Sequence, residues 1–214
     1  MMSSRATTTV TIHGSSQPSR SPVFNLPNQL TFARAGLAVV LFALIAHEQW
    51  AWCLAVFAVA AFTDWLDGYL ARAHNLGTAL GRILDPLVDK VLMCGTYVSL
   101  LPRGEREGWL LPWMVTVVVA RELVITGLRG YLESAGAVFG ADWLGKLKMG
   151  LQCAAVIAVF VVLLGPYPWP ALTAFFGRAR DGLIWAMLAA TILSGLQYLW
   201  RAAVLLRGEG PKVP

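Results

Sequence analysis

The sequence predicts an all-α integral membrane protein built as a bundle of six transmembrane helices. Hydrophobic residues make up 57% of the 214 positions and charged residues only 14%, whereas ordinary soluble domains are about 45–50% apolar and about 25% charged. The mean hydropathy is +0.62, and the apolar residues form long blocks rather than being scattered along the chain. A soluble enzyme, a disordered chain and a fibrous repeat all fit this composition poorly.

Six apolar blocks define the expected helices. A helix needs about 20 residues to cross about 30 Å of hydrocarbon, and a spanning backbone must satisfy its own hydrogen bonds. The blocks cover about residues 30–46, 49–72, 84–102, 109–130, 147–165 and 182–205. Residues 103–108 and 166–181 are expected to be loops. Tryptophans near the block ends are expected at the membrane interface: Trp109, Trp113, Trp169 and Trp200.

The transmembrane domain is expected to occupy residues 25–207. Residues 1–24 are rich in Ser and Thr, carry Arg5 and Arg20 and contain no acid. This composition predicts a disordered tail and leaves a transit peptide as the alternative. Residues 208–214 are expected to form a C-terminal tail.

The formal net charge is +5, which in a membrane protein is typical of cytoplasmic loops that face anionic lipid. Lys and Arg in short loops favour both termini on the cytoplasmic side, although Arg178 and Arg180 argue the other way. The chain has no basic run with interleaved aromatic residues, which argues against a nucleic-acid partner. The cysteines form no CxxC pair and are interpreted as buried small hydrophobic residues: Cys53, Cys94 and Cys153.

Acidic residues gather in one short part of the chain. Four of the twelve fall within 26 residues: Asp64, Asp67, Asp85 and Asp89. Positions three and four apart share a helical face, and a short connection makes two helices antiparallel neighbours, so the four carboxylates can converge. Converging carboxylates either stay partly protonated or bind cations, and oxygen ligands select hard ions such as Mg²⁺ or Mn²⁺. A cluster of this size suits two ions about 3.5–4 Å apart, as in phosphoryl displacement.

Small and basic residues accompany the acids on the same stripe. Gly68 and Ala71 remove bulk so that a ligand can approach the backbone, and Arg72 adds a planar cation suited to a phosphate. This combination favours a metal and phosphate site. The alternatives are an acidic proton relay and a network of salt bridges that packs the helices.

The complete pattern, D-x2-D-G-x2-A-R-x8-G-x3-D-x3-D from Asp64 to Asp89, resembles the signature of the CDP-alcohol phosphatidyltransferases. The resemblance implies a six-helix membrane fold, usually homodimeric, with a polar active site facing the cytoplasm and two divalent cations held by the aspartates. It also implies that a CDP-linked lipid lies with its nucleotide against the glycine and alanine, and that an alcohol displaces CMP. The expected location is the inner or plasma membrane of a bacterium.

Flanking segments are similar to those of one branch of this family, the bacterial phosphatidylglycerophosphate synthases. They are Asn25-Leu26-Pro27-Asn28 with Leu30-Thr31 and Arg34, Thr63 to Tyr69, Ala120-Arg121-Glu122 with Thr126 to Arg129, and Gly145 to Lys148 with Gln152. One departure is Met149, where a Thr is common in that branch. The similarity implies transfer of the phosphatidyl group from CDP-diacylglycerol to sn-glycerol 3-phosphate.

By this resemblance, each motif position receives a role. Asp64, Asp67 and Asp85 are expected to be metal ligands, and Asp89 to be both a metal-side carboxylate and the general base. The expected contacts of the CDP-lipid are Asp64, Gly68, Ala71, Arg72 and Gly81.

Glycerol 3-phosphate needs cations for its own phosphate. The candidates are Arg34, Arg121, Arg129, Lys146 and Lys148. The alternative for the two lysines is a role as positive-inside anchors, and for Arg121 it is a structural salt bridge to another helix. A pair between Arg121 and Glu122 is not expected, because adjacent residues of a helix face apart.

Three rival functions remain open. Two share the chemistry but use another acceptor: a cardiolipin synthase acting on phosphatidylglycerol, or a phosphatidyltransferase acting on inositol phosphate or serine. The basic residues of the fourth and fifth blocks favour a phosphorylated acceptor. A cation-coupled transporter is the remote alternative, since it would spread polar residues over several helices.

Overall fold

The computed structural model describes residues 26–74, 79–134, 143–165, 167 and 169–206. These residues form six helices and no strand, which confirms the all-α prediction. The helices are α1 (Leu26–Ala46), α2 (Trp50–His74), α3 (Ala79–Glu107), α4 (Pro112–Ser134), α5 (Trp143–Leu163) and α6 (Pro170–Leu206). The two predicted tails, 1–24 and 208–214, lie outside the described residues.

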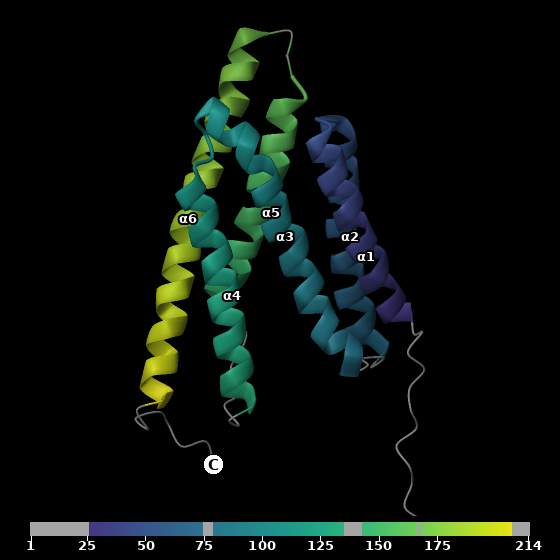
Figure 1. Ribbon diagram of the computed structural model, residues 1–214, viewed down its shortest axis with the longest axis vertical. Coiled ribbons are helices and arrows are strands. Elements are labelled where there is room, and N and C mark those ends of the chain that lie inside the picture. Colours follow the sequence, from purple (N-terminus) through teal and green to yellow (C-terminus); the bar gives the residue numbers. More distant parts are fainter. Residues whose placement is uncertain (1–25, 75–78, 135–142, 166, 168, 207–214) are drawn as a thin grey trace, which may run out of the picture.

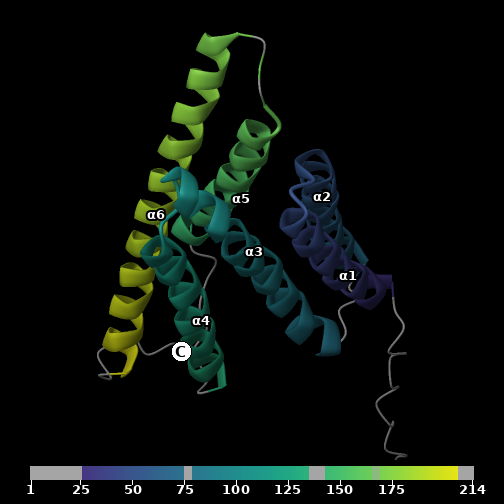
Figure 2. The ribbon, with the colours of Figure 1, turned by 45° about the horizontal axis from the view of Figure 1, so that its top comes forward.

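Helices α1 and α2 form one group and helices α4 and α6 form a second, and α3 and α5 lie between them (Figure 1). Helix α1 contacts both α2 and α3, while α6 contacts α4 and α5. Helix α3 also contacts α4 and α5, and α2 contacts α5, so these middle helices join the two groups (Figures 1 and 2). Helix α1 begins and α6 ends at the same end of the bundle, the lower end in Figure 1.

The turn between α3 and α4 corrects the expected loop at 103–108. Helix α3 continues to Glu107 and ends at Gly108, whose φ of 78° is the left-handed conformation that favours glycine. The Gly108 N–H donates to the Glu105 carbonyl at 3.2 Å, and the Trp109 N–H donates to the Gly104 carbonyl at 3.0 Å. This is a Schellman cap. It leaves Trp109 buried, so this tryptophan is not the interfacial residue we expected.

Helix α6 corrects the second expected loop. It begins at Pro170, so most of the expected 166–181 loop is helical. Proline is favoured at the first position of a helix because its fixed φ suits the helix and its missing N–H is not needed there. Arg180, which lies within the expected loop, belongs to this helix and lies over the Trp109 ring with 4.9 Å between the guanidinium carbon and the ring centroid.

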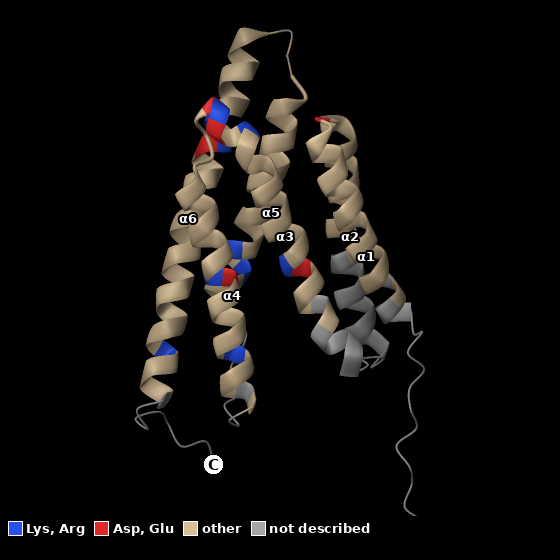
Figure 3. Cartoon of the chain, viewed as in Figure 1, with Lys and Arg blue, Asp and Glu red and all other residues tan. Residues whose placement is uncertain are grey.

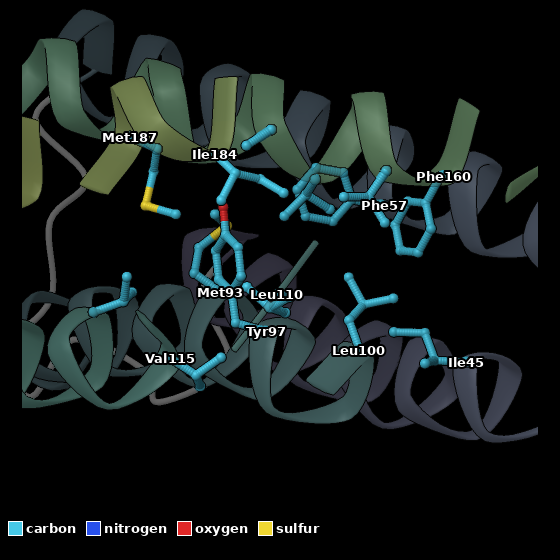
Figure 4. Packing of buried hydrophobic residues seen from close by; sticks show 14 of the residues in the cluster. Ile45, Phe57, Met93, Tyr97, Leu100, Leu110, Val115, Phe160, Ile184 and Met187 are labelled. Atoms are coloured by element: carbon cyan, nitrogen blue, oxygen red, sulfur yellow. The ribbon is translucent and has the colours of Figure 1, made fainter. Parts of the chain in front are cut away.

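A continuous apolar core joins all six helices. The rings of Phe57 on α2 and Phe160 on α5 meet edge to face at 6.1 Å (Figure 4). Tyr97 on α3 is buried, and its hydroxyl donates to the backbone carbonyl of Gln152 on α5 at 3.0 Å. Cys53 lies in this core, and all three cysteines are free thiols.

Large apolar side chains also point outward from every helix. Examples on six different helices are Val39, Trp52, Leu87, Leu123, Ile157 and Trp200. Within the described residues, α5 (Trp143–Leu163) and most of α6 (Pro170–Leu205) are long and apolar enough to cross a bilayer, while Thr31–Ala46 and Trp50–Thr63 are shorter apolar runs. Charged residues interrupt α3 and α4, so their length and composition alone do not identify them as spans. Six membrane crossings therefore stay a prediction.

Candidate active site

The motif predicted to hold metal and nucleotide lies on two helices. Asp64, Asp67, Gly68, Ala71 and Arg72 belong to the C-terminal part of α2, and Gly81, Asp85 and Asp89 belong to the N-terminal half of α3. Asp89 is the motif residue whose side chain is described, and the other seven side chains lie outside the described residues. Among the described side chains, no three His, Cys, Asp or Glu residues gather in a way that could hold a metal ion. The metal cluster of the motif therefore stays a prediction.

Asp89 forms an ion pair with the first helix. The Arg34 guanidinium on α1 donates from Nη1 to Asp89 Oδ1 at 2.5 Å. The Arg34 side chain is 1% exposed and that of Asp89 is 24% exposed. Arg34, predicted to bind the acceptor phosphate, therefore directly contacts and orients the predicted general base.

A second charged group joins α4 and α5. Lys148 on α5 is buried and donates to Glu122 on α4, which is also buried. Arg121 lies 3.4 Å from the same Glu122 oxygen and donates to Ser194 on α6 at 3.0 Å. The expectation that Arg121 would not pair with its neighbour is wrong, because its long side chain curls toward the buried carboxylate. One acid thus serves two cations.

A pocket of about 210 Å³ lies between α3, α4 and α5. It brings the predicted base and one predicted phosphate ligand together, since Asp89 and Lys148 both line it. The other lining residues are Pro86, Lys90 and Met93 on α3, Glu122 on α4, and Met149 and Gln152 on α5. Ligand pockets for drug-sized molecules measure about 300–1,000 Å³, so this pocket suits a smaller molecule.

Two of the predicted phosphate ligands lie elsewhere. Arg129 contacts Tyr198 on α6, with Nε 3.3 Å from the hydroxyl and the guanidinium carbon 5.5 Å from the ring centroid. Arg121 and Arg129 therefore face α6 from the same side of α4, as their spacing of eight predicts. Lys146 is exposed near the start of α5 and does not line the pocket.

Charged side chains gather at two places in the bundle. Figure 3 shows acidic and basic residues midway along α3 and α4, and a second group at the end where α3 meets α4. Four charged residues line the pocket: Asp89, Lys90, Glu122 and Lys148. Buried charges are costly to desolvate, and ionisable groups gathered in a pocket are candidates for a functional site.

Comparison with known proteins agrees with the motif. A model of the CDP-alcohol phosphatidyltransferase family matches residues 24–195. The chain belongs to this family. The CDP-diacylglycerol–glycerol-3-phosphate 3-phosphatidyltransferase of Bacillus subtilis (strain 168) is 35% identical over 200 residues, which cover 84% of this chain and 97% of that protein. The proteins of the same name from Salmonella paratyphi A and Escherichia coli (strain K12) are each 32% identical over 182 residues, covering 82% of this chain and 93% of theirs.

Membership in the CDP-alcohol phosphatidyltransferase family confirms the resemblance predicted from the motif. Two pocket residues, however, received no role from the sequence. Glu122 was considered only as a neighbour of Arg121, and Gln152 only as part of a similar segment. A signal for both exists, because each is a polar residue inside an apolar helix.

Proposed function

We propose that this chain transfers the phosphatidyl group from CDP-diacylglycerol to sn-glycerol 3-phosphate, giving phosphatidylglycerophosphate and CMP. The observation that carries this function is the pocket in which Asp89 of the family motif and Lys148 of α5 line the same small space. The names and coverage of the relatives support the same donor and acceptor.

Asp89 is the proposed general base. It takes the proton from the acceptor hydroxyl while that oxygen forms a bond to the lipid-side phosphorus of the diphosphate. The bond from this phosphorus to the CMP oxygen breaks, and CMP leaves. A base must lie within about 3 Å of the proton's oxygen, and the pairing of Asp89 with buried Arg34 fixes the direction of its carboxylate.

Lys148 is the proposed ligand of the acceptor phosphate. Arg121 lies near it, because both side chains pair with the same oxygen of Glu122. An ammonium carries three N–H donors, so Lys148 can keep its bond to Glu122 and donate to a phosphate as well. Arg129 and Lys146 stay candidates for a phosphate that approaches from outside the pocket. The proposed CDP-lipid contacts are Asp64, Gly68, Ala71, Arg72 and Gly81.

The donor set of the motif fits a pair of hard divalent cations. Asp85 precedes Asp89 by four residues on α3, about one helical turn, and Asp64 and Asp67 lie three apart on α2. These four carboxylates would hold Mg²⁺ or Mn²⁺, whose ligands are oxygens. When bound, the cations supply charge neutralisation on the diphosphate and on departing CMP.

Removal of the cations tests the proposed metal dependence. Incubation with EDTA is expected to abolish CMP release, and addition of excess Mg²⁺ is expected to restore it. Full turnover after chelation would contradict the metal assignment and leave the transfer reaction itself intact.

The bundle is proposed to span the membrane six times, with both termini and the pocket toward the cytoplasm. The outward-facing apolar residues of all six helices support this, since soluble monomers rarely expose large apolar surfaces. Helix α1 begins and α6 ends at the same end of the bundle, which agrees with an even number of crossings (Figure 1). The homodimer implied by the family stays a prediction.

One assay decides between the acceptors. The purified protein receives labelled CDP-diacylglycerol, Mg²⁺ and one acceptor at a time, and CMP release is measured. We expect release with glycerol 3-phosphate and little with phosphatidylglycerol, inositol phosphate or serine. Release with phosphatidylglycerol alone would instead make the chain a cardiolipin synthase.

A further inference from the structure

Gln152 is a buried polar residue of the pocket that no step of the proposed reaction uses. Its residue exposure is 2%, and its backbone carbonyl accepts the Tyr97 hydroxyl bond. Its side-chain Nε2 has no hydrogen-bond partner in the part of the chain that the structure describes. A buried amide donor without a partner is destabilising, so such a group in a pocket calls for an explanation.

Three of the four charged residues that line the same pocket form ion pairs, and the fourth, Lys90, donates to the Pro86 carbonyl at 3.3 Å. Asp89 is engaged by Arg34, and Lys148 is engaged by Glu122. Gln152 therefore differs from them, since it lines the same space and keeps an unfilled donor. A neutral donor of this kind suits a neutral oxygen, such as a hydroxyl, which both donates and accepts.

Gln152 lines the pocket together with Lys148, the proposed ligand of the acceptor phosphate, and Asp89, the proposed base for the acceptor hydroxyl. It lies four residues after Lys148 on α5, on the same face and about 6 Å farther along the helix axis. Asp89 reaches the pocket from α3. A small phosphorylated polyol held by its phosphate at Lys148 and by its reacting hydroxyl at Asp89 has one further hydroxyl between them.

We infer that Gln152 is a specificity-determining residue that donates a hydrogen bond to the non-reacting hydroxyl of the acceptor. The substrate class is a short polyol phosphate with adjacent hydroxyls, in which the primary hydroxyl attacks and the secondary one is recognised. This inference rests on the proposed function. Sites built to bond a hydroxyl reject analogues that lack it, because the site's polar group then stays unpaired.

The test compares two acceptors that differ by one hydroxyl. Glycerol 3-phosphate carries both hydroxyls, while 3-hydroxypropyl phosphate keeps the primary hydroxyl and lacks the secondary one. The unsubstituted protein is expected to prefer glycerol 3-phosphate in kcat/KM. In Gln152→Met, which keeps the length and removes the donor, this preference is expected to fall roughly tenfold, while kcat/KM for the analogue changes little.

Gln197→Met is the matched control. Gln197 on α6 also has a buried side-chain atom without a partner among the described residues, but it does not line the pocket. Its substitution is expected to leave the ratio of the two kcat/KM values unchanged. A purely structural role of Gln152 would lower both kcat/KM values together and leave their ratio the same, which would overturn the inference.

Two further outcomes are separable. If the unsubstituted protein releases no CMP with glycerol 3-phosphate, the proposed function is wrong and the inference falls with it. If it does release CMP and the preference survives in Gln152→Met, the inference alone is wrong. Should Gln152→Met not accumulate as a folded protein, Gln152→Leu removes the donor and the acceptor of the amide with a smaller apolar side chain. The same loss of preference is then expected, and an unchanged ratio overturns the inference.

Discussion

Two groups of charges in this bundle use the same residue types in opposite ways. At the end where α3 meets α4, Arg103 pairs with Glu48 at 3.3 Å and with Glu107 at 2.6 Å. These side chains are all about one third exposed or more. Around the pocket, by contrast, Arg34 is 1% exposed and the Lys148 and Glu122 side chains are 7% and 9% exposed.

Exposure decides what each group can contribute. Exposed ion pairs are worth about 0–1 kcal/mol because water screens them and long side chains lose entropy. Buried charges cost far more to desolvate, and that cost is recovered only when each charge keeps its partners. We call the charges around the pocket the inner group and the charges at the end where α3 meets α4 the outer group. The inner group consists of Arg34, Asp89, Arg121, Glu122 and Lys148, and the outer group of Glu48, Arg103, Arg106, Glu107, Arg180 and Asp181. The inner group is therefore retained for a task other than stability, whereas the outer group fits the ordinary role of joining helix ends.

The largest expected difference between the two groups is in turnover. Asp89→Asn is expected to lower CMP release by about 10²–10⁴-fold, the usual contribution of a general base, while CMP binding stays largely intact. Initial rates with glycerol 3-phosphate and CMP titration measure the two effects. Asp181→Asn, at an exposed carboxylate of the outer group that pairs with Arg180, is the control and should keep full activity. Retained activity in Asp89→Asn would refute its role as the base.

The next difference is in stability. Glu122→Gln leaves Lys148 buried without its carboxylate partner, which is expected to cost about 3–5 kcal/mol. For a chain of this length the melting temperature then falls by about 6–20 °C. Glu48→Gln breaks exposed pairs with Arg103 and Arg106 and is expected to change it by less than about 4 °C. Thermal unfolding of both variants in the same detergent makes the measurement, and equal shifts would remove the distinction between the groups.

The sequence predicts the helical framework well because apolar periodicity and length are local properties. It misplaces two helix ends, since Arg103, Arg106 and Arg180 look like loop residues when only charge is counted. Their true setting depends on contacts between distant segments, such as Arg180 on Trp109 and Arg103 on Glu48. No local rule contains those contacts.

The candidate site also has features that the sequence predicts and features that depend on contacts between distant segments. The spacing of the motif alone predicts that Asp89 is a functional residue, and the family membership agrees with the motif. The sharing of Glu122 by Lys148 and Arg121 was not predictable, because it requires the register of α4 against α5. Burial of Arg34 against Asp89 likewise requires the packing of α1 on α3.

A smaller effect is expected at the glycine that ends α3. Gly108→Ala forces a side chain into the left-handed conformation, which costs roughly 1–2 kcal/mol. Nothing lies within 4 Å of the added carbon, so the cost is conformational and not steric. The melting temperature should fall by about 2–8 °C with CMP release unchanged. Gly182→Ala, within α6 and equally uncrowded, is expected to leave stability unchanged or slightly raised. Loss of activity in Gly108→Ala would show that the outer group is coupled to the pocket.

The smallest expected effect is a pH dependence of the outer group at Glu107. Burial alone would raise the pKa of Glu107, but bonds from the Trp109 indole at 2.8 Å and from Arg103 at 2.6 Å lower it below its usual 4.5. Because the folded-state pKa lies below the unfolded one, the stabilisation is fully present above pH 4.5 and is lost as pH falls through the folded value. The melting temperature of Glu107→Gln should therefore lie slightly below that of the parent near neutral pH, and the gap should close as the pH falls below 4.5. In a Trp109→Phe background, which removes the indole donor, the pH-dependent part of this gap is expected to narrow. A gap of constant size down to about pH 3 would mean that the charge of Glu107 contributes nothing to the stability of this end of the bundle.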